Sequence, residues 1–245
     1  MSYLDKLFSV TGKTALVTGA ATGIGRMVAT GLIRAGAHVM IASRKGEDCA
    51  KVANELNALG GSGQAEGFAG DVSSEAGIAA LVTEVKARTE RLHILVNNAG
   101  IQHVAPIDDF PIEKWEAVVA IDLMSSFYTI RRALQAMKAR KWGRIINVAS
   151  AHALVASPYK SAYVAAKHGV AGLTKTVALE VAEQGITVNA VCPGYVLTPL
   201  VEKQIPDTAK ARGITEQQVI KDVLLAAQPT KQFVTVEQGA ALCLF

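Results

Sequence analysis

The chain has 245 residues, of which 50% are hydrophobic and 19% are charged, and its formal net charge is +4; these values are typical of one packed α/β domain. No apolar run reaches the ~18 residues that a membrane span needs, and the N-terminus lacks the basic segment and long apolar core of a secretory signal, so we expect no membrane partner and a cytoplasmic location. Basic residues interleave with acidic ones, which does not favour nucleic-acid binding, and the three widely spaced cysteines indicate free thiols and no metal site.

The first elements predict a dinucleotide site. A short apolar strand over residues 13–18 precedes the pattern Gly-x-x-x-Gly-x-Gly and a helical pattern that continues to Ala35. Such a turn lets backbone amides at a helix N-terminus approach a pyrophosphate, although a glycine-rich turn is also found in purely structural roles. The flanking strand and helix favour the binding role, and the candidate residues are Gly19, Thr22, Gly23, Ile24 and Gly25.

The second strand, residues 38–42, ends at Ser43 and Arg44, where a dinucleotide fold discriminates the adenosine ribose. An acidic residue at this place would favour NAD. Arg44 has a guanidinium that pairs well with a 2′-phosphate, so NADP is allowed, and a solvated surface arginine is the alternative. The cofactor is therefore NAD or NADP, with the choice left open.

Strand and helix patterns then alternate to the end of the chain, which predicts one doubly wound parallel sheet of the Rossmann type in a three-layer αβα domain over residues 1–245. The predicted helices cover residues 46–59, 74–89, 111–140 and a segment around Tyr163 to about residue 182, and the predicted strands cover 64–68, 93–96, 143–149 and 187–191. A polar, helix-containing excursion at about residues 199–232 suits a lid, and Thr235 with Gln238 forms the pattern of a capping box.

Further cofactor contacts are expected where the later strands end, because open α/β sheets bind ligands at their carboxyl edge. Asp71 and Val72 follow the third strand, and Asn98 and Gly100 follow the fourth in a run of small residues that permits close backbone approach. Ordinary turn chemistry also explains these residues. The loop after the sixth strand adds Pro193, Gly194, Val196 and Thr198.

The strongest catalytic signal is the pair Tyr163 and Lys167, four residues apart in an Ala-rich helical run, so that both side chains leave one face of the helix. A nearby positive charge favours the phenolate and makes Tyr163 a stronger proton acceptor. Ser150 follows a buried strand, where its hydroxyl could bind a substrate oxygen. Taken alone, such a Tyr-x-x-x-Lys pair would more often be an ordinary helix surface, but the glycine turn is an independent second signal.

Together these motifs resemble the short-chain dehydrogenase/reductase family across nearly the whole chain. The resemblance is carried by Gly19 to Gly25, the Asn-Asn-Ala-Gly run at 97–100, Ser150, Tyr163 with Lys167, and Pro193-Gly194. From residue 97 onward the chain resembles the bacterial D-3-hydroxybutyrate dehydrogenases of that family, through the segments 97–103, 150–152, 160–163 and 199–204.

The resemblance implies an NAD(P)-dependent oxidoreductase that transfers a hydride between nicotinamide and a short 3-hydroxy acid, with 3-hydroxybutyrate and acetoacetate as the expected substrate pair, and that assembles as a homotetramer. It assigns the substrate hydroxyl to Ser150 and Tyr163 and the nicotinamide ribose to Lys167. It assigns substrate binding, chiefly of the carboxylate, to Gln102, His152, Lys160, Tyr195 and Gln204.

Three departures from the family pattern bear on the expected function. Arg44 is more like NADP-using relatives, Asp122 stands where the family usually has an Asn that completes a proton relay to the catalytic Lys, and the sequence stops at Phe245 without the family's last strand. Two alternatives follow: an NADPH-dependent reductase of another small keto compound or 3-oxoacyl substrate, and a dinucleotide-binding regulatory protein without activity. Intact Ser150, Tyr163 and Lys167 weigh against the second.

Overall fold

The computed structural model describes residues 3–245, without the side chains of residues 4–6. Its strands are β1 (Thr14–Thr18), β2 (His38–Ser43), β3 (Gln64–Ala69), β4 (Ile94–Asn97), β5 (Gly143–Val148) and β6 (Ile186–Val191). Its main helices are α1 (Tyr3–Phe8), α2 (Gly23–Arg34), α3 (Gly46–Ala58), α4 (Glu75–Arg88), α5 (Ile112–Val119), α6 (Ser125–Arg140), α7 (Ser161–Glu180), α8 (Pro199–Arg212), α9 (Glu216–Gln218) and α10 (Val236–Leu244).

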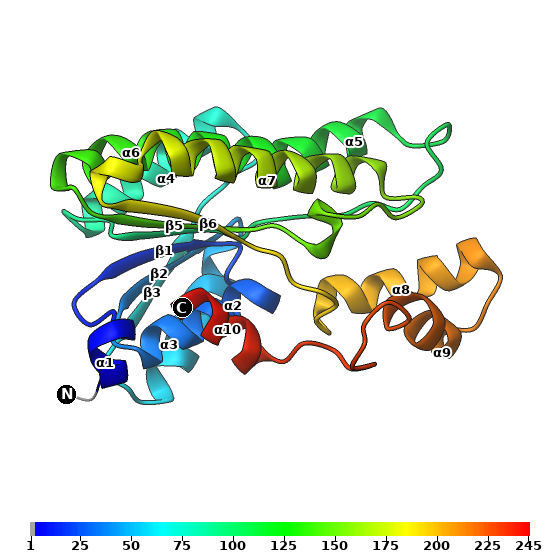
Figure 1. Cartoon of the computed structure of the whole chain (residues 1–245), viewed down its shortest axis with the longest axis horizontal. Helices are drawn as coiled ribbons and strands as arrows, with labels where there is room; N and C mark the ends of the chain where they lie inside the picture. Colours follow the sequence, from blue (N-terminus) through cyan, green and yellow to red (C-terminus); the bar gives the residue numbers. More distant parts are fainter. Residues whose placement is uncertain (1–2) are drawn as a thin grey trace.

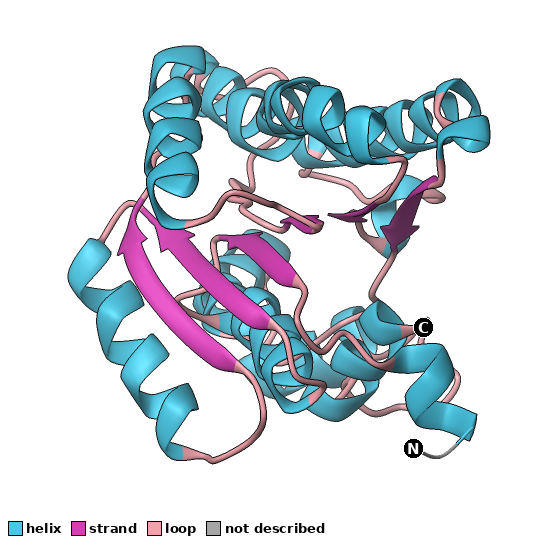
Figure 2. Cartoon of the chain, turned by 90° about the vertical axis from the view of Figure 1, so that its left-hand side faces the viewer, coloured by secondary structure: helices cyan, strands magenta, loops and turns pink. Residues whose placement is uncertain are grey.

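The six strands form one parallel sheet in the order β3-β2-β1-β4-β5-β6. Helices α4 to α7 cover one face, and α2, α3 and α10 cover the other (Figure 1). The view turned by 90° shows the twisted sheet between the two helical layers (Figure 2). The predicted doubly wound Rossmann-type fold is confirmed, and the order reverses between β1 and β4, which is where such sheets bind ligands.

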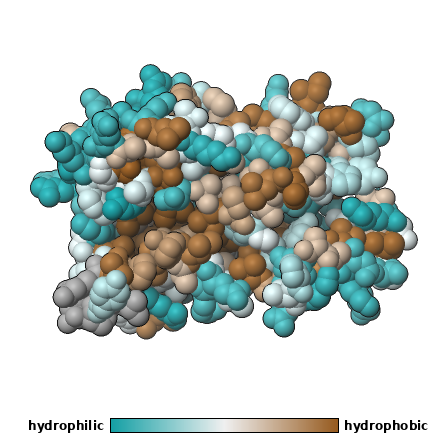
Figure 3. Space-filling model, in the orientation of Figure 1, coloured by the Kyte–Doolittle hydropathy of each residue, from teal (hydrophilic) through white to brown (hydrophobic). Residues whose placement is uncertain are grey.

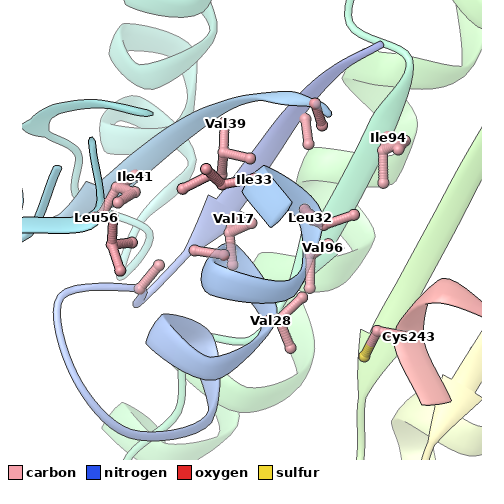
Figure 4. Close-up of a cluster of buried hydrophobic side chains, with 14 of the residues drawn as sticks. Val17, Val28, Leu32, Ile33, Val39, Ile41, Leu56, Ile94, Val96 and Cys243 are labelled. Atoms are coloured by element: carbon pink, nitrogen blue, oxygen red, sulfur yellow. The ribbon is translucent and has the colours of Figure 1, made fainter. Parts of the chain in front are cut away.

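Two apolar clusters fill the spaces between the sheet and its helices. Because parallel strands are buried on both faces, β1, β2 and β4 are continuous apolar runs whose side chains enter the two clusters alternately. Figure 4 shows the cluster under α2, where Val28 and Leu32 of the helix meet Val17 of β1 and Val96 of β4. This packing holds the N-terminus of α2 rigidly at the end of β1.

The sequence predicted one continuous helix over residues 111–140, and this prediction is wrong. The segment 111–140 consists of α5, the π-helical turn η1 (Ala120–Met124) and α6. Single π turns of this kind occur often at functional sites. Here the turn contains Asp122, whose Oδ1 accepts a hydrogen bond of 2.8 Å from the backbone N–H of Ile101.

The excursion at 199–232 is helical, as expected, and consists of α8, α9 and the π-helical turn η4 (Val219–Leu224). It projects beyond the sheet at the carboxyl ends of the strands (Figure 1). Ile205, Val219 and Leu224 form its own small core, separate from the two clusters of the sheet. Its role as a lid stays a prediction.

The last segment begins with the predicted capping box. The Thr235 hydroxyl accepts from the backbone N–H of Gln238, and the Gln238 side chain accepts from the backbone N–H of Thr235. Apolar residues gather around α10 on the face seen in Figure 3, and Leu242 and Phe245 of this segment are exposed. Over the residues that are described, no helix has both the length and the apolar character needed to cross a membrane.

Candidate active site

A cleft of about 630 Å³ lies at the carboxyl ends of β1 to β5. Its walls come from the turns after these strands, from α7 and from the start of α8. The sequence-predicted site residues that line it are Gly19, Thr22, Gly23, Ile24, Ser43, Arg44, Asp71, Val72, Asn98, Gly100, Asp122, Tyr163, Lys167 and Thr198.

The glycine turn between β1 and α2 is closely packed, which explains its residue types. Gly19 has φ +66°, and a Cβ on it would lie 2.8 Å from the Cα of Ala99. A Cβ on Gly25 would lie 2.4 Å from Nδ2 of Asn98 and 2.7 Å from the carbonyl oxygen of Gly19, so Gly25 lies behind the cleft and permits the helix to approach the sheet. At the N-terminus of α2, the side chain of Thr22 makes no capping hydrogen bond. Gly23 and Ile24, the first residues of α2, line the cleft, and their amides are available to an anion because no side chain caps them.

Asn98 joins the turns after β4 and β1. Its Nδ2 donates to the carbonyl oxygens of Thr18, at 2.9 Å, and Gly19, at 3.2 Å, while its backbone N–H donates to the Thr18 hydroxyl. The side chain of Asn98 is therefore a structural clamp for the glycine turn. We expect its contribution to cofactor binding to come from this support.

The far end of the cleft, after β2 and β3, is more polar than the sequence alone indicated. Arg44 lies there with Lys45, and both are exposed. Asp48, in the first turn of α3, and Ser73 also line this end and were missed, because helix-start residues give no separate signal. Asp71 accepts hydrogen bonds from the backbone N–H and hydroxyl of Ser73, each at 2.9 Å. These contacts orient the Asp71 carboxylate at the cleft wall.

At the other end of the cleft, α7 presents Tyr163 and Lys167 on one face, as predicted. The Lys167 ammonium lies 5.4 Å from the centre of the Tyr163 ring and donates a hydrogen bond of 3.0 Å to the carbonyl oxygen of Val148. Lys167 is buried, whereas Tyr163 is half-buried at the cleft. The geometry gives Tyr163 access to a ligand and a fixed positive charge behind it.

Asp122 points toward Lys167 from the π-helical turn. Its Oδ2 lies 3.4 Å from Nζ of Lys167, and both side chains are almost completely buried. Burial alone would lower the pKa of Lys167, but the attraction of the Asp122 carboxylate and of Tyr163 outweighs it, so this pKa is raised. Burial raises the pKa of Asp122, opposed by Lys167 and by the Ile101 N–H. The Ile101 N–H at Oδ1 and the Lys167 ammonium near Oδ2 both favour the ionised form of the carboxylate.

Ser150 follows β5 and caps the short 3₁₀ helix η2 (Ala151–Ala153). Its hydroxyl oxygen accepts from the backbone N–H of His152 at 3.1 Å and lies 3.4 Å from Nδ1 of the same residue. The His152 ring packs edge-on against Tyr163, with ring centres 6.1 Å apart. Burial, reinforced by the charge of Lys160, lowers the pKa of His152 to about 4, so its imidazole is neutral at pH 7. A neutral ring serves as a hydrogen-bonding group beside Ser150.

The expected substrate-binding residues continue from His152. The ring of Tyr195 lies 6.3 Å from the His152 ring, and the Lys160 ammonium lies 5.7 Å from the centre of the Tyr195 ring. Nε2 of Gln102 is buried and donates no hydrogen bond to the described part of the chain. Gln204 is different, because its Nε2 donates to the carbonyl oxygen of Leu200 in its own helix, at 2.9 Å. Like Ser150, Gln102 and His152, it lines neither the main cleft nor the smaller cavity beside Lys160.

Pro193, Gly194 and Val196 lie in the loop after β6 and do not line the cleft, whereas Thr198 does and caps α8. The Pro193 carbonyl oxygen accepts from the N–H of Ala151, which joins the loop to the segment of Ser150. Oε1 of Gln228 accepts from the N–H of Tyr195 at 2.7 Å, and a Cβ on Gly194 would lie 2.3 Å from this atom. Gln228 was not predicted, since only the folded chain brings it to this loop.

Comparisons with known proteins agree with this geometry. Residues 13–209 match the family described as short chain dehydrogenase. D-beta-hydroxybutyrate dehydrogenase of Rhizobium meliloti (strain 1021) is 55% identical over 95% of this chain and 90% of its own, and that of Cupriavidus necator is 50% identical over 96% and 90%. The crystal structure of a gluconate 5-dehydrogenase from Burkholderia cenocepacia J2315 in complex with NADP and tartrate superposes with a TM-score of 0.86, at 32% identity over 99% of this chain and 91% of that one.

Proposed function

We propose that this chain, which belongs to the short-chain dehydrogenase family, transfers a hydride between a nicotinamide dinucleotide and C3 of a short 3-hydroxy acid such as D-3-hydroxybutyrate. As a member of the family it is an oxidoreductase that acts on CH–OH groups with NAD or NADP. The substrate is the part that we propose. Homotetrameric assembly and a cytoplasmic location stay predictions.

One observation carries the choice of substrate. The rings of Tyr163, His152 and Tyr195 pack one against the next, and the Lys160 ammonium lies at the Tyr195 end of this series. A substrate with a hydroxyl at one end and a carboxylate at the other would meet the acid/base group and the cation together. An uncharged alcohol would leave the half-buried Lys160 without a partner. The two D-beta-hydroxybutyrate dehydrogenases support this substrate class through their overall similarity.

The cleft fits a dinucleotide by the shape and chemistry of its walls. Gly19 and Gly25 leave no room for a Cβ, and the amides at the start of α2 face the cleft without a capping side chain. Gly19, Thr22, Gly23 and Ile24 would hold the pyrophosphate, Asp71 and Val72 the adenine, and Lys167 the nicotinamide ribose. When bound, the nicotinamide supplies the acceptor or donor of the hydride.

The protein's own groups handle the proton and the substrate orientation. In the oxidation, the Tyr163 phenolate accepts the hydroxyl proton, while the hydroxyl of Ser150 holds the substrate oxygen in place. Lys167 stabilises the phenolate by its positive charge, and Val148 and Asp122 hold the ammonium from the other side. Lys160 and Gln102 orient the carboxylate end. In the reverse reaction Tyr163 donates the proton to the forming alkoxide.

The charged groups at the coenzyme end of the cleft bear on the choice between NAD and NADP. Arg44 and Lys45 place two positive charges beside the predicted ribose position, where a 2′-phosphate would be bound. Asp48 lines the same end and would repel such a phosphate. These groups act in opposite directions, so we propose that the chain accepts both coenzymes.

A steady-state assay tests the proposal. The formation of reduced nicotinamide is followed by absorbance with D-3-hydroxybutyrate, its L enantiomer, its methyl ester and butan-2-ol, each with NAD and with NADP. We expect the D acid to have a kcat/KM at least tenfold above the ester and the simple alcohol. Equal or better turnover of the uncharged compounds would reject the 3-hydroxy acid as the substrate class.

A further inference from the structure

A second, small cavity lies between the body of the domain and the excursion that contains α8. On the body side it is lined by the segment 157–160 and by Tyr195. On the other side it is lined by Thr208, Ala211 and Arg212 of α8 and by Val223 and Leu224. Within the described part of the chain its only charged lining residues are Lys160 and Arg212, and both are positive.

Neither cation has an acidic partner. The ion pairs found among the described side chains join other residues, so Lys160 and Arg212 lie without a carboxylate within 4.0 Å. Burial first, and then repulsion from Arg212, lowers the pKa of Lys160 to about 8, which leaves it charged at neutral pH. An anion between the half-buried Lys160 and the exposed Arg212 would be attracted by both charges.

Helix chemistry explains only part of this arrangement. A basic residue in the last turn of a helix interacts favourably with the helix dipole, and both Lys210 and Arg212 occupy that turn of α8. Lys210 and Arg212 are both exposed, but only Arg212 lines the cavity. The dipole therefore explains why basic residues occur in this turn. It does not explain why Arg212 lines the same cavity as Lys160.

We propose that Arg212 is a second cationic ligand of the substrate carboxylate, shared with Lys160, and that the shared anion holds α8 against the body of the domain. The inference rests on the proposed function and extends it, because it assigns substrate recognition to a residue of α8. A short 3-hydroxy acid would extend from Tyr163 toward Lys160 and present its carboxylate between the two cations.

The packing of the excursion allows such a closure. Ile205, Val219 and Leu224 give the excursion its own core, so α8 with η4 has internal support when it moves relative to the sheet. Figure 1 shows α8 and α9 beyond the end of the sheet, joined to β6 by the loop through Tyr195. An anion between Lys160 and Arg212 replaces repulsion by attraction on both sides, which draws the two walls together.

The test compares Arg212→Gln with Arg212→Lys and with the matched control Lys210→Gln. KM is measured for D-3-hydroxybutyrate and for its uncharged methyl ester, and the affinity for the acid is measured by calorimetry with the oxidised coenzyme bound. Because a hydrogen bond to a charged group contributes ~1.5–3 kcal/mol, Arg212→Gln should raise KM and Kd for the acid roughly 10- to 100-fold. KM for the ester should change less than about twofold. Arg212→Lys should recover part of the loss, and Lys210→Gln should resemble the unmodified protein.

Hydrogen exchange provides a readout of closure. In the unmodified protein, the acid should slow amide exchange in α8, and this protection should be lost in Arg212→Gln. Unchanged Kd for the acid in Arg212→Gln, or an equal loss for acid and ester, would overturn the inference while the proposed function stands. If the unmodified protein binds the acid through Arg212 without oxidising it, the proposed function fails and the anion site remains. If it does not bind the acid at all, both are rejected.

Discussion

The Asp122 carboxylate and the Lys167 ammonium form a buried ion pair with 3.4 Å between Oδ2 and Nζ. The pair is held in place by the Ile101 N–H on the carboxylate and by the Val148 carbonyl oxygen on the ammonium. The negative charge next to Lys167 offsets part of the field that Lys167 exerts on Tyr163. Asp122 is therefore a positioning residue whose charge adjusts the acid/base group through the lysine.

Asp122→Asn should move the pH–rate profile of the oxidation to lower pH, by roughly one unit, because an opposite charge within ~4–6 Å shifts a titration by one to three units. Asparagine keeps an oxygen for the Ile101 N–H but leaves Lys167 without its counter-charge, so the melting temperature should fall. The control is Asp108→Asn, which removes an exposed carboxylate. An unchanged profile, or a shift to higher pH, would contradict the role given to Asp122.

Tyr163→Phe should lower kcat by at least ~10²-fold, since general acid–base catalysis typically contributes ~10²–10⁴-fold. The dinucleotide should still bind with nearly the same affinity, which fluorescence titration of the reduced coenzyme measures. The control is Tyr128→Phe, which removes a phenol hydroxyl from α6 and should leave turnover unchanged. Near-normal turnover of Tyr163→Phe would reject Tyr163 as the proton acceptor.

Lys160→Met should raise KM for the acid and also stabilise the fold at pH 7. In the folded chain the pKa of Lys160 is lowered from 10.5 to about 8. Between these two pH values the unfolded chain binds more protons than the folded chain, so the free energy of unfolding rises with pH. At pH 7 Lys160 is protonated in both states, and burial of its charge lowers the stability of the fold. Removal of the charge should therefore raise the free energy of unfolding by roughly 1–3 kcal/mol. The measurements are a melting curve and steady-state kinetics.

The matched control for that variant is Lys175→Met, which removes an exposed charge from the same helix as Tyr163 and Lys167. It should change neither KM nor the melting temperature noticeably. A destabilised Lys160→Met would show that Lys160 contributes to the stability of the empty protein and is not kept for an anion.

Arg44→Ala should weaken NADP binding roughly tenfold or more and leave NAD binding within about twofold, because only NADP has a 2′-phosphate for the guanidinium. Asp48→Asn, at the same end of the cleft, should have the opposite effect and tighten NADP binding. Dissociation constants for both coenzymes are measured by titration. Equal changes for NAD and NADP would indicate that Arg44 is a solvated surface residue.

Gly25→Ala should weaken binding of either dinucleotide and lower the melting temperature. The added Cβ would lie 2.7 Å from the backbone oxygen of Gly19 and 2.8 Å from the Cα of Ala20, so the turn itself must shift. Gly172→Ala on α7 has nothing within 4 Å of the new Cβ and is the matched control. A Gly25→Ala protein with normal affinity would mean that the packing of this turn does not control the cofactor site.

The sequence by itself determined the features that depend on local spacing. The alternation of strands and helices, the glycine turn from Gly19 to Gly25, and the common face of Tyr163 and Lys167 were all predicted, because backbone periodicity and glycine requirements act over a few residues. The family's motifs then gave each of these segments an expected role. The assignment of the substrate-binding residues stays a prediction, with Gln204 bonded to its own helix.

The tertiary structure alone decided what depends on groups far apart in the chain. The π-helical turn at Asp122 breaks a helix that looked continuous, and its side chain meets Ile101 and Lys167 from positions 21 and 45 residues away. In the same way, Gln228 supports the loop of Tyr195, and Arg212 borders Lys160. Charges and hydrogen bonds of this kind act through space. A local pattern of residue types does not indicate which distant groups will lie next to one another in the folded chain.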